Sequence, residues 1–236
     1  MFLFLDYDGT LAPIADSPGE AFMPQTIRSL LEEVSEKIPV AIVSGRSLMD
    51  LRGRVGLEGI VYAGNHGAEI WDGRIVVQQE MSGGRVVVKE LVERLEKAVA
   101  HISGALVEEK GATASLHYRN VDPLRRDELL DLFTNIAGDY QGLVRITHGK
   151  KVLEVRPIHA WNKGDAVLWI MDAMGEGRLP IYIGDDTTDE DAYRAIRGRG
   201  ISVSIGYNSE ADYHLKSQGE VRDLLSLVLK EERIKT

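Results

Sequence analysis

Cysteine is absent from the 236-residue sequence. Its absence excludes thiol catalysis, disulfide bridges and thiolate-bound zinc or iron–sulfur sites. Basic residues are few relative to acidic ones, since 28 Lys and Arg against 37 Asp and Glu give a formal net charge of −9. Because sequence-independent nucleic-acid binding requires a basic face, we expect no nucleic-acid partner. An anionic ligand would have to be attracted by a few well-placed cations.

Long hydrophobic runs are also missing, because no apolar stretch approaches the roughly 18 residues of a membrane-spanning helix. The apolar segment Met1–Leu5 has no basic region before it and is followed at once by Asp6, which is not typical of a signal peptide. With 44% apolar and 28% charged residues, the composition is that of a globular protein. We expect a cytoplasmic protein that has no membrane partner.

Short apolar segments alternate with helical patterns in both outer parts of the chain. Met1–Leu5 and Ile38–Val43 are typical of buried strands, and an amphipathic pattern follows Pro24 through about Lys37. The alternation returns near the C-terminus, in Asn162–Met174, Pro180–Gly184, Glu190–Ile196, Ile201–Ile205 and Glu220–Leu229. This pattern predicts an α/β protein with a Rossmann-like, doubly wound parallel sheet.

The middle of the chain has a different pattern, in which each of two helical segments precedes two strand segments. In chain order these segments are Val86–Ile102, Ala105–Glu108, Ala112–Arg119, Pro123–Ala137, Leu143–His148 and Lys151–Arg156. We predict an inserted α+β (αββαββ) cap domain at 83–157 and a core at 1–82 and 158–236. Ser82–Gly84 and Pro157–Ala160 would be the linkers.

Four polar clusters occupy the places where open α/β sheets bind ligands, after strands or at a helix start. They are Asp6–Thr10, Ser44–Arg46, Asn162–Gly164 and Gly184–Asp189. Asp6 and Asp8 are also typical turn residues, and Ser44 is equally typical of a helix N-cap. Taken singly, these residues leave both interpretations open.

Carboxylates are crowded in two of the clusters. Asp6 and Asp8 are two residues apart at a strand end, and five of the seven residues from Asp185 onward are acidic. A Thr-x-x-Glu capping box beginning at Thr187 would account for the later acids, but not for Asp185 and Asp186, which directly follow an apolar strand. Because close carboxylates repel unless a cation or a shared proton relieves them, we predict an oxygen-ligated Mg²⁺.

Lys163 stands in the first turn of a predicted helix, with Asn162 as its N-cap. A cation at this end opposes the helix dipole by about 0.3–1 kcal/mol when exposed. Contact with an anion would offset that cost, since helix N-termini bind anions. A simple surface lysine is the alternative.

The order, placement and spacing of these clusters resemble the four motifs of the haloacid dehalogenase-like (HAD) phosphohydrolases. The corresponding residues are Asp6-x-Asp8-Gly9-Thr10, Ser44, Lys163 and Gly184-Asp185-Asp186-x-x-Asp189. Within that superfamily the sequence is most similar to the trehalose-6-phosphate phosphatases, through Leu5–Leu11, Val43–Arg46, Gly64–Glu69, Ser115–Arg119 and Gly149–Pro157. The resemblance covers essentially the whole chain and implies a HAD core with a type-two cap.

The resemblance also implies catalytic roles. Asp6 would be the nucleophile that forms an aspartyl-phosphate. Asp8 would protonate the leaving sugar oxygen and then act as general base for the hydrolytic water. Lys163 and the Ser44 hydroxyl would neutralise the charge on the phosphoryl oxygens.

Metal binding is implied for the same motifs. Mg²⁺ would be held by the side chains of Asp6 and Asp185 and by the backbone carbonyl of Asp8. Asp186 and Asp189 would support the ion through water or through its ligands rather than bind it directly.

Substrate specificity would come from the cap. If Lys150 continues the strand Lys151–Arg156, then Lys150 and Glu154 share one face of it, and His117 and Arg119 share a face of their own strand. These side chains would contact sugar hydroxyls, the alternative being a solvent-facing charged surface.

Two residues of the core are further candidates for substrate binding. Arg46 follows the second motif and would contact the substrate, or would only pair with an acid. His66, in Asn65–Gly67, would contact the sugar or simply belong to a turn.

We therefore predict a Mg²⁺-dependent phosphomonoesterase that converts trehalose 6-phosphate to trehalose and phosphate. It would be a monomer whose partner is a small-molecule sugar phosphate. The alternatives are a sucrose-phosphate, glycosyl-phosphoglycerate or phosphoglycolate phosphatase, and a phosphosugar mutase. A non-catalytic divalent-cation-binding module is the alternative from a different class.

Overall fold

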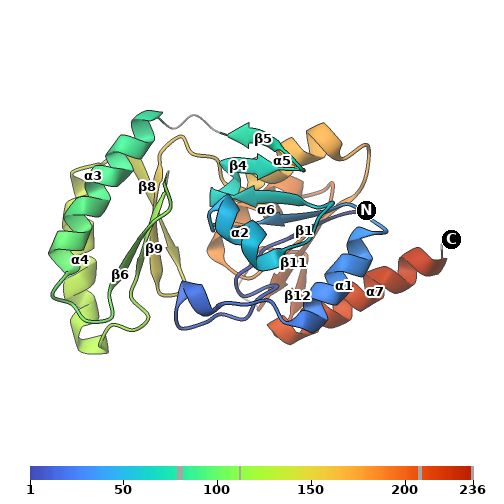
Figure 1. The fold of residues 1–236 in the computed structure, drawn as a ribbon, viewed down its shortest axis with the longest axis horizontal. Coiled ribbons are helices and arrows are strands. Elements are labelled where there is room, and N and C mark those ends of the chain that lie inside the picture. The colour runs from blue at the N-terminus through green and yellow to red at the C-terminus, as the bar shows by residue number, and fades with distance from the viewer. Residues whose placement is uncertain (79–81, 112, 207–208, 235–236) are drawn as a thin grey trace. The chain divides into compact units, whose positions relative to one another are not determined.

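A computed structural model describes residues 1–78, 82–111, 113–206 and 209–234 (Figure 1). Two compact units are formed. The first, the core, comprises Met1–Gln78 and Trp161–Thr236, and the second, the cap, comprises Gln79–Ala160. Among the described residues, no helix is long and apolar enough to cross a membrane.

An eight-stranded sheet forms the centre of the core. Its strands are β1 (Phe2–Leu5), β2 (Val40–Val43), β3 (Val61–Gly64), β4 (Glu69–Trp71), β5 (Ile75–Gln78), β10 (Pro180–Gly184), β11 (Ile201–Ile205) and β12 (Tyr213–Leu215). The order across the sheet is β12-β11-β10-β1-β2-β3-β4-β5. Neighbours from β12 to β3 are parallel, and β4 and β5 join antiparallel.

Helices cover both faces of this sheet because side chains alternate along its buried strands. The core helices are α1 (Gln25–Ser35), α2 (Leu48–Val55), α5 (Lys163–Met174), α6 (Glu190–Ile196) and α7 (Val221–Ile234). Leu3 and Leu5 pack with α1, α2 and α7, which form one layer, while Phe2 and Phe4 pack with α5 and α6 in the other. Figure 1 shows α1 and α7 side by side. The predicted doubly wound sheet is confirmed.

The chain order of the strands reverses at β1, which has β2 on one side and β10 on the other. The backbone N–H of Asp6 donates to the Ile183 carbonyl at 2.9 Å, so the residues after β1 and β10 leave the sheet side by side. Ligands of open α/β sheets bind at such a switch point. The topology therefore brings the early and late acidic motifs to one edge.

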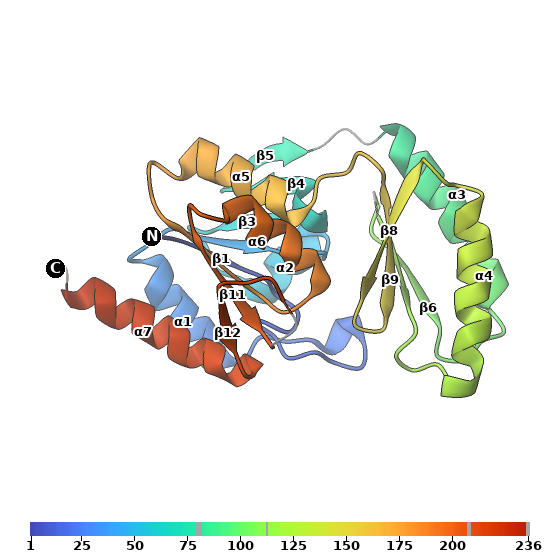
Figure 2. The same ribbon diagram turned by 180° about the vertical axis from the view of Figure 1, so that it is seen from behind.

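The cap is an antiparallel sheet with helices on one face (Figure 2). Its elements are α3 (Ser82–Val99), β6 (Leu106–Glu109), β7 (Ala114–His117), α4 (Arg126–Gly138), β8 (Val144–Gly149) and β9 (Val152–Pro157), and its strand order is β6-β7-β9-β8. The predicted αββαββ order is confirmed.

The prediction of a linker at Ser82–Gly84 is wrong, because helix α3 already begins at Ser82. A glycine inside a helix costs about 1 kcal/mol relative to alanine. Val88, Leu91 and Leu95 of the same helix are fully buried in the cap core. Burying an aliphatic side chain contributes about 1.5–3 kcal/mol, so tertiary packing outweighs the local preference.

Replacing Leu91 by alanine is expected to destabilise the cap by about 2–5 kcal/mol, because methyl groups are deleted from a fully buried position. Leu124→Ala is the matched control. It removes the same atoms from a side chain that is 91% exposed, so the change should stay within about 0.5 kcal/mol. Urea denaturation measures both values, and equal losses would contradict the placement of Leu91 in the cap core.

Candidate active site

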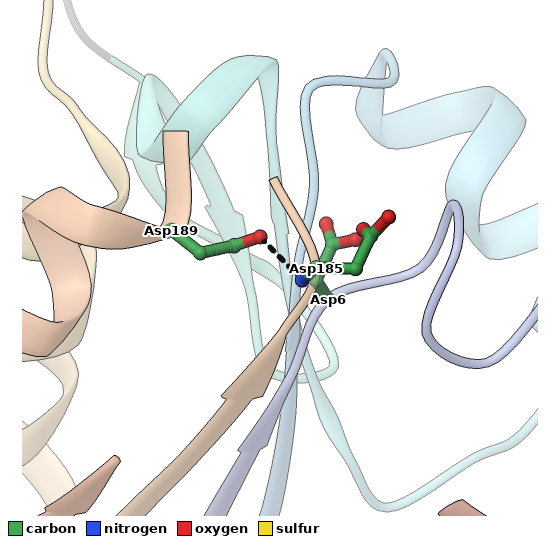
Figure 3. Close-up of side chains that lie close together, drawn as sticks. All are labelled: Asp6, Asp185 and Asp189. Atoms are coloured by element: carbon green, nitrogen blue, oxygen red, sulfur yellow. Dashed lines mark hydrogen bonds between the residues drawn. The ribbon is translucent and has the colours of Figure 1, made fainter. Parts of the chain in front are cut away.

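Three carboxylates converge where β1 and β10 end. Asp6 follows β1, Asp185 and Asp189 follow β10, and one oxygen of each lies within 4.8 Å of the others. Figure 3 shows the carboxylates of Asp6 and Asp185 pointing in the same direction, while Asp189 reaches toward the backbone nitrogen of Asp185. The structure thus brings together three of the acids that the sequence pattern selected.

Lys163 enters this acidic group from the first turn of α5. Its Nζ lies 2.7 Å from Asp6 Oδ1 and 2.7 Å from Asp189 Oδ1, and the residue is only 3% exposed. An ammonium has three N–H donors. Two of them point to these carboxylates, so one N–H is not used by the acidic pair.

The start of α5 is fixed by local and tertiary contacts. Asn162 is the N-cap, as predicted, and forms a reciprocal capping box with Asp165. Gly164 packs so closely on α6 that a Cβ would collide with the backbone carbonyl of Asp191. The first turn of α5 therefore has little freedom, and Lys163 is held toward the switch point.

The charges of this group do not balance. Burial raises the pKa of Asp6, and Lys163 opposes that shift while Asp189 and Asp185 add to it. Burial alone would lower the pKa of Lys163, but the carboxylates of Asp189 and Asp6 outweigh it and raise the pKa, so that the amine stays protonated. With all three carboxylates ionised, one ammonium leaves an excess of two negative charges. This repulsion contributes to the raised pKa of Asp6, and a divalent cation would relieve it.

Asp189 is fully buried and accepts four hydrogen bonds. Its Oδ1 accepts from Lys163 Nζ and from the Tyr182 hydroxyl, both at 2.7 Å. Its Oδ2 accepts from the backbone N–H groups of Asp185, at 3.0 Å, and Asp186, at 2.9 Å. These bonds fill the roughly four lone-pair positions of a carboxylate. Asp189 is therefore suited to orient the loop and the lysine rather than to ligate a metal.

Asp186 has a local structural role. It is the N-cap of the short 3₁₀ turn Thr187–Asp189, and its Oδ1 accepts from the Thr187 N–H at 2.7 Å. Asp189 completes the capping box. The predicted capping box ran from Thr187 to Glu190. The observed box begins one residue earlier, at Asp186, because the Asp189 side chain accepts hydrogen bonds from the backbone N–H groups that follow β10.

Gly9 gives the carboxylate of Asp185 room to approach the loop after β1. Its φ of +87° lies in the region that favours glycine, and a Cβ there would collide with the Asp185 carboxylate. The two acidic motifs thus fit together only with glycine at this position. The carboxylate oxygens of Asp6 and Asp185 form a donor set that fits a hard divalent cation such as Mg²⁺.

Asp8 lies outside the group of three acids, since its carboxylate forms a two-point ion pair with Arg46. Arg46 Nη2 is 2.6 Å from Asp8 Oδ1, and Arg46 Nε is 2.7 Å from Asp8 Oδ2. Arg46 Nη1 also donates to Asp50 Oδ2 at 2.7 Å, and Arg54 donates to the same carboxylate. The sequence left open whether Arg46 pairs with an acid or contacts the substrate. The structure contains the ion pair, and the substrate contact stays a prediction.

This ion-pair network keeps Arg46 charged. Burial alone would lower the pKa of Arg46, but the hydrogen bonds and charges of Asp8 and Asp50 outweigh it and raise the pKa. Sequence reasoning missed Asp50 and Arg54. The two residues are four positions apart on α2, a spacing at which an acid and a base pair on one face of a helix, and this spacing could have identified them.

Ser44 and His66 are buried in the turns that follow β2 and β3. Ser44 Oγ accepts the Arg46 N–H at 3.2 Å, and the Ser44 carbonyl accepts the His66 N–H at 2.9 Å. His66 has a φ of +58°, an unfavourable conformation for a residue with a side chain. Gly67 then packs against α5, where a Cβ would collide with Ala166. Their roles in phosphate and sugar binding stay predictions.

Polar side chains share the face of the cap sheet that is opposite its helices. Glu108, Ser115, Glu154 and Thr147 are cross-strand neighbours in one row. Ala114 and Leu116, which flank Ser115, and Leu153 and Val155, which flank Glu154, pack on the other face in the cap core. Lys110 Nζ lies 3.8 Å from Glu108 Oε2 and 3.7 Å from Glu154 Oε1. Sequence reasoning selected Glu154 but missed Glu108 and Lys110.

Two of the predicted cap faces are wrong. Strand β7 ends at His117, so Arg119 lies beyond it and donates from Nη2 to the Lys150 carbonyl at 2.9 Å. Lys150 belongs to the turn before β9, and the φ of +67° at Lys151 breaks the expected alternation. His117 pairs with Glu108, Nε2 to Oε2, at 2.8 Å. Sugar contacts by these residues stay predictions.

The family model of the trehalose-phosphatases matches residues 4–222. The chain belongs to the trehalose-phosphatase family. It is 38% identical to a probable trehalose-phosphate phosphatase of Oryza sativa subsp. japonica, over 94% of this chain and 66% of that protein. The crystal structure of a trehalose-6-phosphate phosphatase related protein has a TM-score of 0.85 and 27% identity, with 100% of both chains covered.

The fold of this family member is also that of the HAD-like hydrolases. Such a hydrolase from Bacteroides thetaiotaomicron matches 96% of this chain and 98% of its own, with a TM-score of 0.69 and 17% identity. At that identity the likeness concerns the fold alone. The chain spans about two thirds of the length of the plant relatives that it matches.

Gly9→Ala is expected to abolish stabilisation by Mg²⁺, because the added methyl group displaces the Asp185 carboxylate. Gly59→Ala is the control, since Gly59 has a similar positive φ of +75° but nothing within 4 Å of a Cβ. Both variants should lose some stability from backbone strain. Melting temperatures with and without MgCl₂ separate the effects, and an equal Mg²⁺-dependent rise in both variants would contradict the role assigned to Gly9.

Proposed function

We propose that the chain is a Mg²⁺-dependent phosphomonoesterase that releases phosphate from trehalose 6-phosphate through an aspartyl-phosphate. The main support is the buried Asp6 carboxylate, held 2.7 Å from Lys163 Nζ at the switch point of the sheet. Membership of the trehalose-phosphatase family supports the reaction class and the sugar.

In the proposed reaction, Asp6 attacks the phosphorus atom and the bond to the sugar oxygen breaks. The Lys163 hydrogen bond fixes the carboxylate before substrate arrives, which lowers the entropic part of the barrier. The remaining N–H of Lys163 and the Ser44 hydroxyl neutralise the phosphoryl oxygens. Water then cleaves the aspartyl-phosphate, which releases inorganic phosphate and restores Asp6.

Asp8 handles the protons in this proposal. It gives a proton to the leaving sugar oxygen and later accepts one from the attacking water. Because Asp8 is paired with Arg46 in the structure, this role requires its carboxyl group to exchange Arg46 for the leaving oxygen.

The proposed Mg²⁺ site consists of the side chains of Asp6 and Asp185 and the backbone carbonyl of Asp8, with Asp186 and Asp189 supporting the loop. When bound, the ion supplies positive charge that offsets the negative charge of the phosphoryl group. The excess negative charge of the three converging acids supports this assignment.

The polar face of the cap sheet is proposed to recognise the sugar. Glu108 and Glu154 can accept hydrogen bonds from sugar hydroxyls, and Lys110, with the predicted contacts His117, Arg119 and Lys150, can donate. A monomer located in the cytoplasm remains part of the proposal.

Asp6→Asn is expected to lower phosphate release by about a thousandfold or more, because the neutral amide removes the nucleophile. Glu190→Gln is the control, as an acid-to-amide change one residue after Asp189 in the first turn of α6, and its activity should stay near that of wild type. Phosphate release from trehalose 6-phosphate, with and without EDTA, measures both. Unchanged turnover in Asp6→Asn would contradict the mechanism.

Glu154→Gln is expected to raise KM for trehalose 6-phosphate about tenfold, because a hydrogen bond to a charged group contributes about 1.5–3 kcal/mol. Turnover of p-nitrophenyl phosphate, which carries no sugar, should change little. Glu109→Gln is the control, since Glu109 lies beside Glu108 on the alternate face of β6.

A panel of sugar phosphates tests the specificity, and equal rates across it would contradict the trehalose assignment.

A further inference from the structure

Tyr182 makes a contact that neither the sequence motifs nor the proposed chemistry explains. It lies in β10, three residues before Asp185, and it is fully buried. Its hydroxyl donates to Asp189 Oδ1 at 2.7 Å, and the same oxygen accepts from Lys163 Nζ. A buried tyrosine thus shares a carboxylate oxygen with the lysine of the site.

The hydrogen bonds of Asp189 divide into two pairs with different tasks. The backbone N–H groups of Asp185 and Asp186 hold Oδ2 and so tie the carboxylate to the loop. The direction of Oδ1 is then set by Tyr182 and Lys163. Without the tyrosine hydroxyl, Oδ1 would have a vacant lone pair in a buried, acidic setting, and only the Lys163 amine would remain to orient it.

We infer that Tyr182 is a positioning residue that acts through Asp189 to hold the Lys163 amine against Asp6. The inference rests on the proposed function, in which the remaining N–H of Lys163 contacts the phosphoryl group. Since that contact strengthens as charge builds up on the oxygens, loosening Lys163 should affect the transition state more than substrate binding.

Tyr193 provides a matched control within the same aromatic pair. Its ring packs edge-on against Tyr182, with centroids 5.7 Å apart and an interplanar angle of 80°. It is as buried as Tyr182, but its hydroxyl hydrogen-bonds to the Val203 carbonyl at 3.4 Å. Each Tyr→Phe change therefore removes one buried hydroxyl from the pair, and only one of these hydroxyls contacts Asp189.

The test compares Tyr182→Phe and Tyr193→Phe by calorimetric binding of orthovanadate, a mimic of the phosphoryl transition state, in MgCl₂. Tyr182→Phe is expected to bind it about tenfold more weakly, since a hydrogen bond to a charged group is lost, and Tyr193→Phe as tightly as wild type. For trehalose 6-phosphate, kcat should fall by about the same factor while KM changes little. Wild-type affinity in Tyr182→Phe, or an equal loss in Tyr193→Phe, would overturn the inference.

A double mutant separates positioning from a general packing defect. In a Lys163→Met background, Tyr182→Phe should have no further effect on orthovanadate binding, because its route of action is gone. An additive loss would overturn the inference. If the wild-type chain binds orthovanadate but releases no phosphate from any sugar phosphate, the proposed function fails, and the binding comparison still decides the role of Tyr182.

Discussion

The ammonium of Lys163 between the carboxylates of Asp6 and Asp189 is the interaction on which the rest of the site depends. Burying an ion costs several kcal/mol unless a partner compensates it, so Asp6 and Lys163 require each other although they are 157 residues apart in the chain. Their meeting follows from the topology, which places β10 beside β1. With all three carboxylates ionised, the pairing leaves surplus negative charge, and this surplus suits the site to a divalent cation.

The backbone of the core is shaped to make this meeting possible. Gly9 allows the Asp185 carboxylate to approach the loop after β1, and Gly164 allows α5 to pack on α6. Asn162 begins α5 one residue before Lys163. Each of these features is a glycine or a helix cap, and together they fix the direction of the Lys163 side chain. The position of Lys163 against Asp6 is thus set by the fold.

Much of this arrangement was predictable from the sequence, because apolar strands that end abruptly in Asp or Gly are local signals. Those signals identified Asp6 and Asp185, the N-cap Asn162 pointed to Lys163, and the alternation of helical and strand patterns gave the αββαββ order of the cap. What escaped prediction depends on tertiary contacts. In the sequence, Tyr182 looks like any aromatic residue of the core, and only the structure shows its bond to Asp189. The sequence also leaves open whether Arg46 pairs with Asp8 or contacts a substrate, and the structure contains the pair with Asp8. Turns at Arg119 and Lys150 disrupted the alternation that a continuous strand would give.

In the proposed metal site, Asp6 and Asp185 hold one divalent cation, and Asp186 caps the turn after β10. Calorimetric titration of MgCl₂ into the wild-type chain, Asp185→Asn and Asp186→Asn distinguishes these two roles, since the variants remove one charge each from adjacent positions. We expect a single site whose affinity falls at least about tenfold in Asp185→Asn, because a metal-ligating carboxylate is lost, and stays near wild type in Asp186→Asn. Equal affinity in wild type and Asp185→Asn would contradict it.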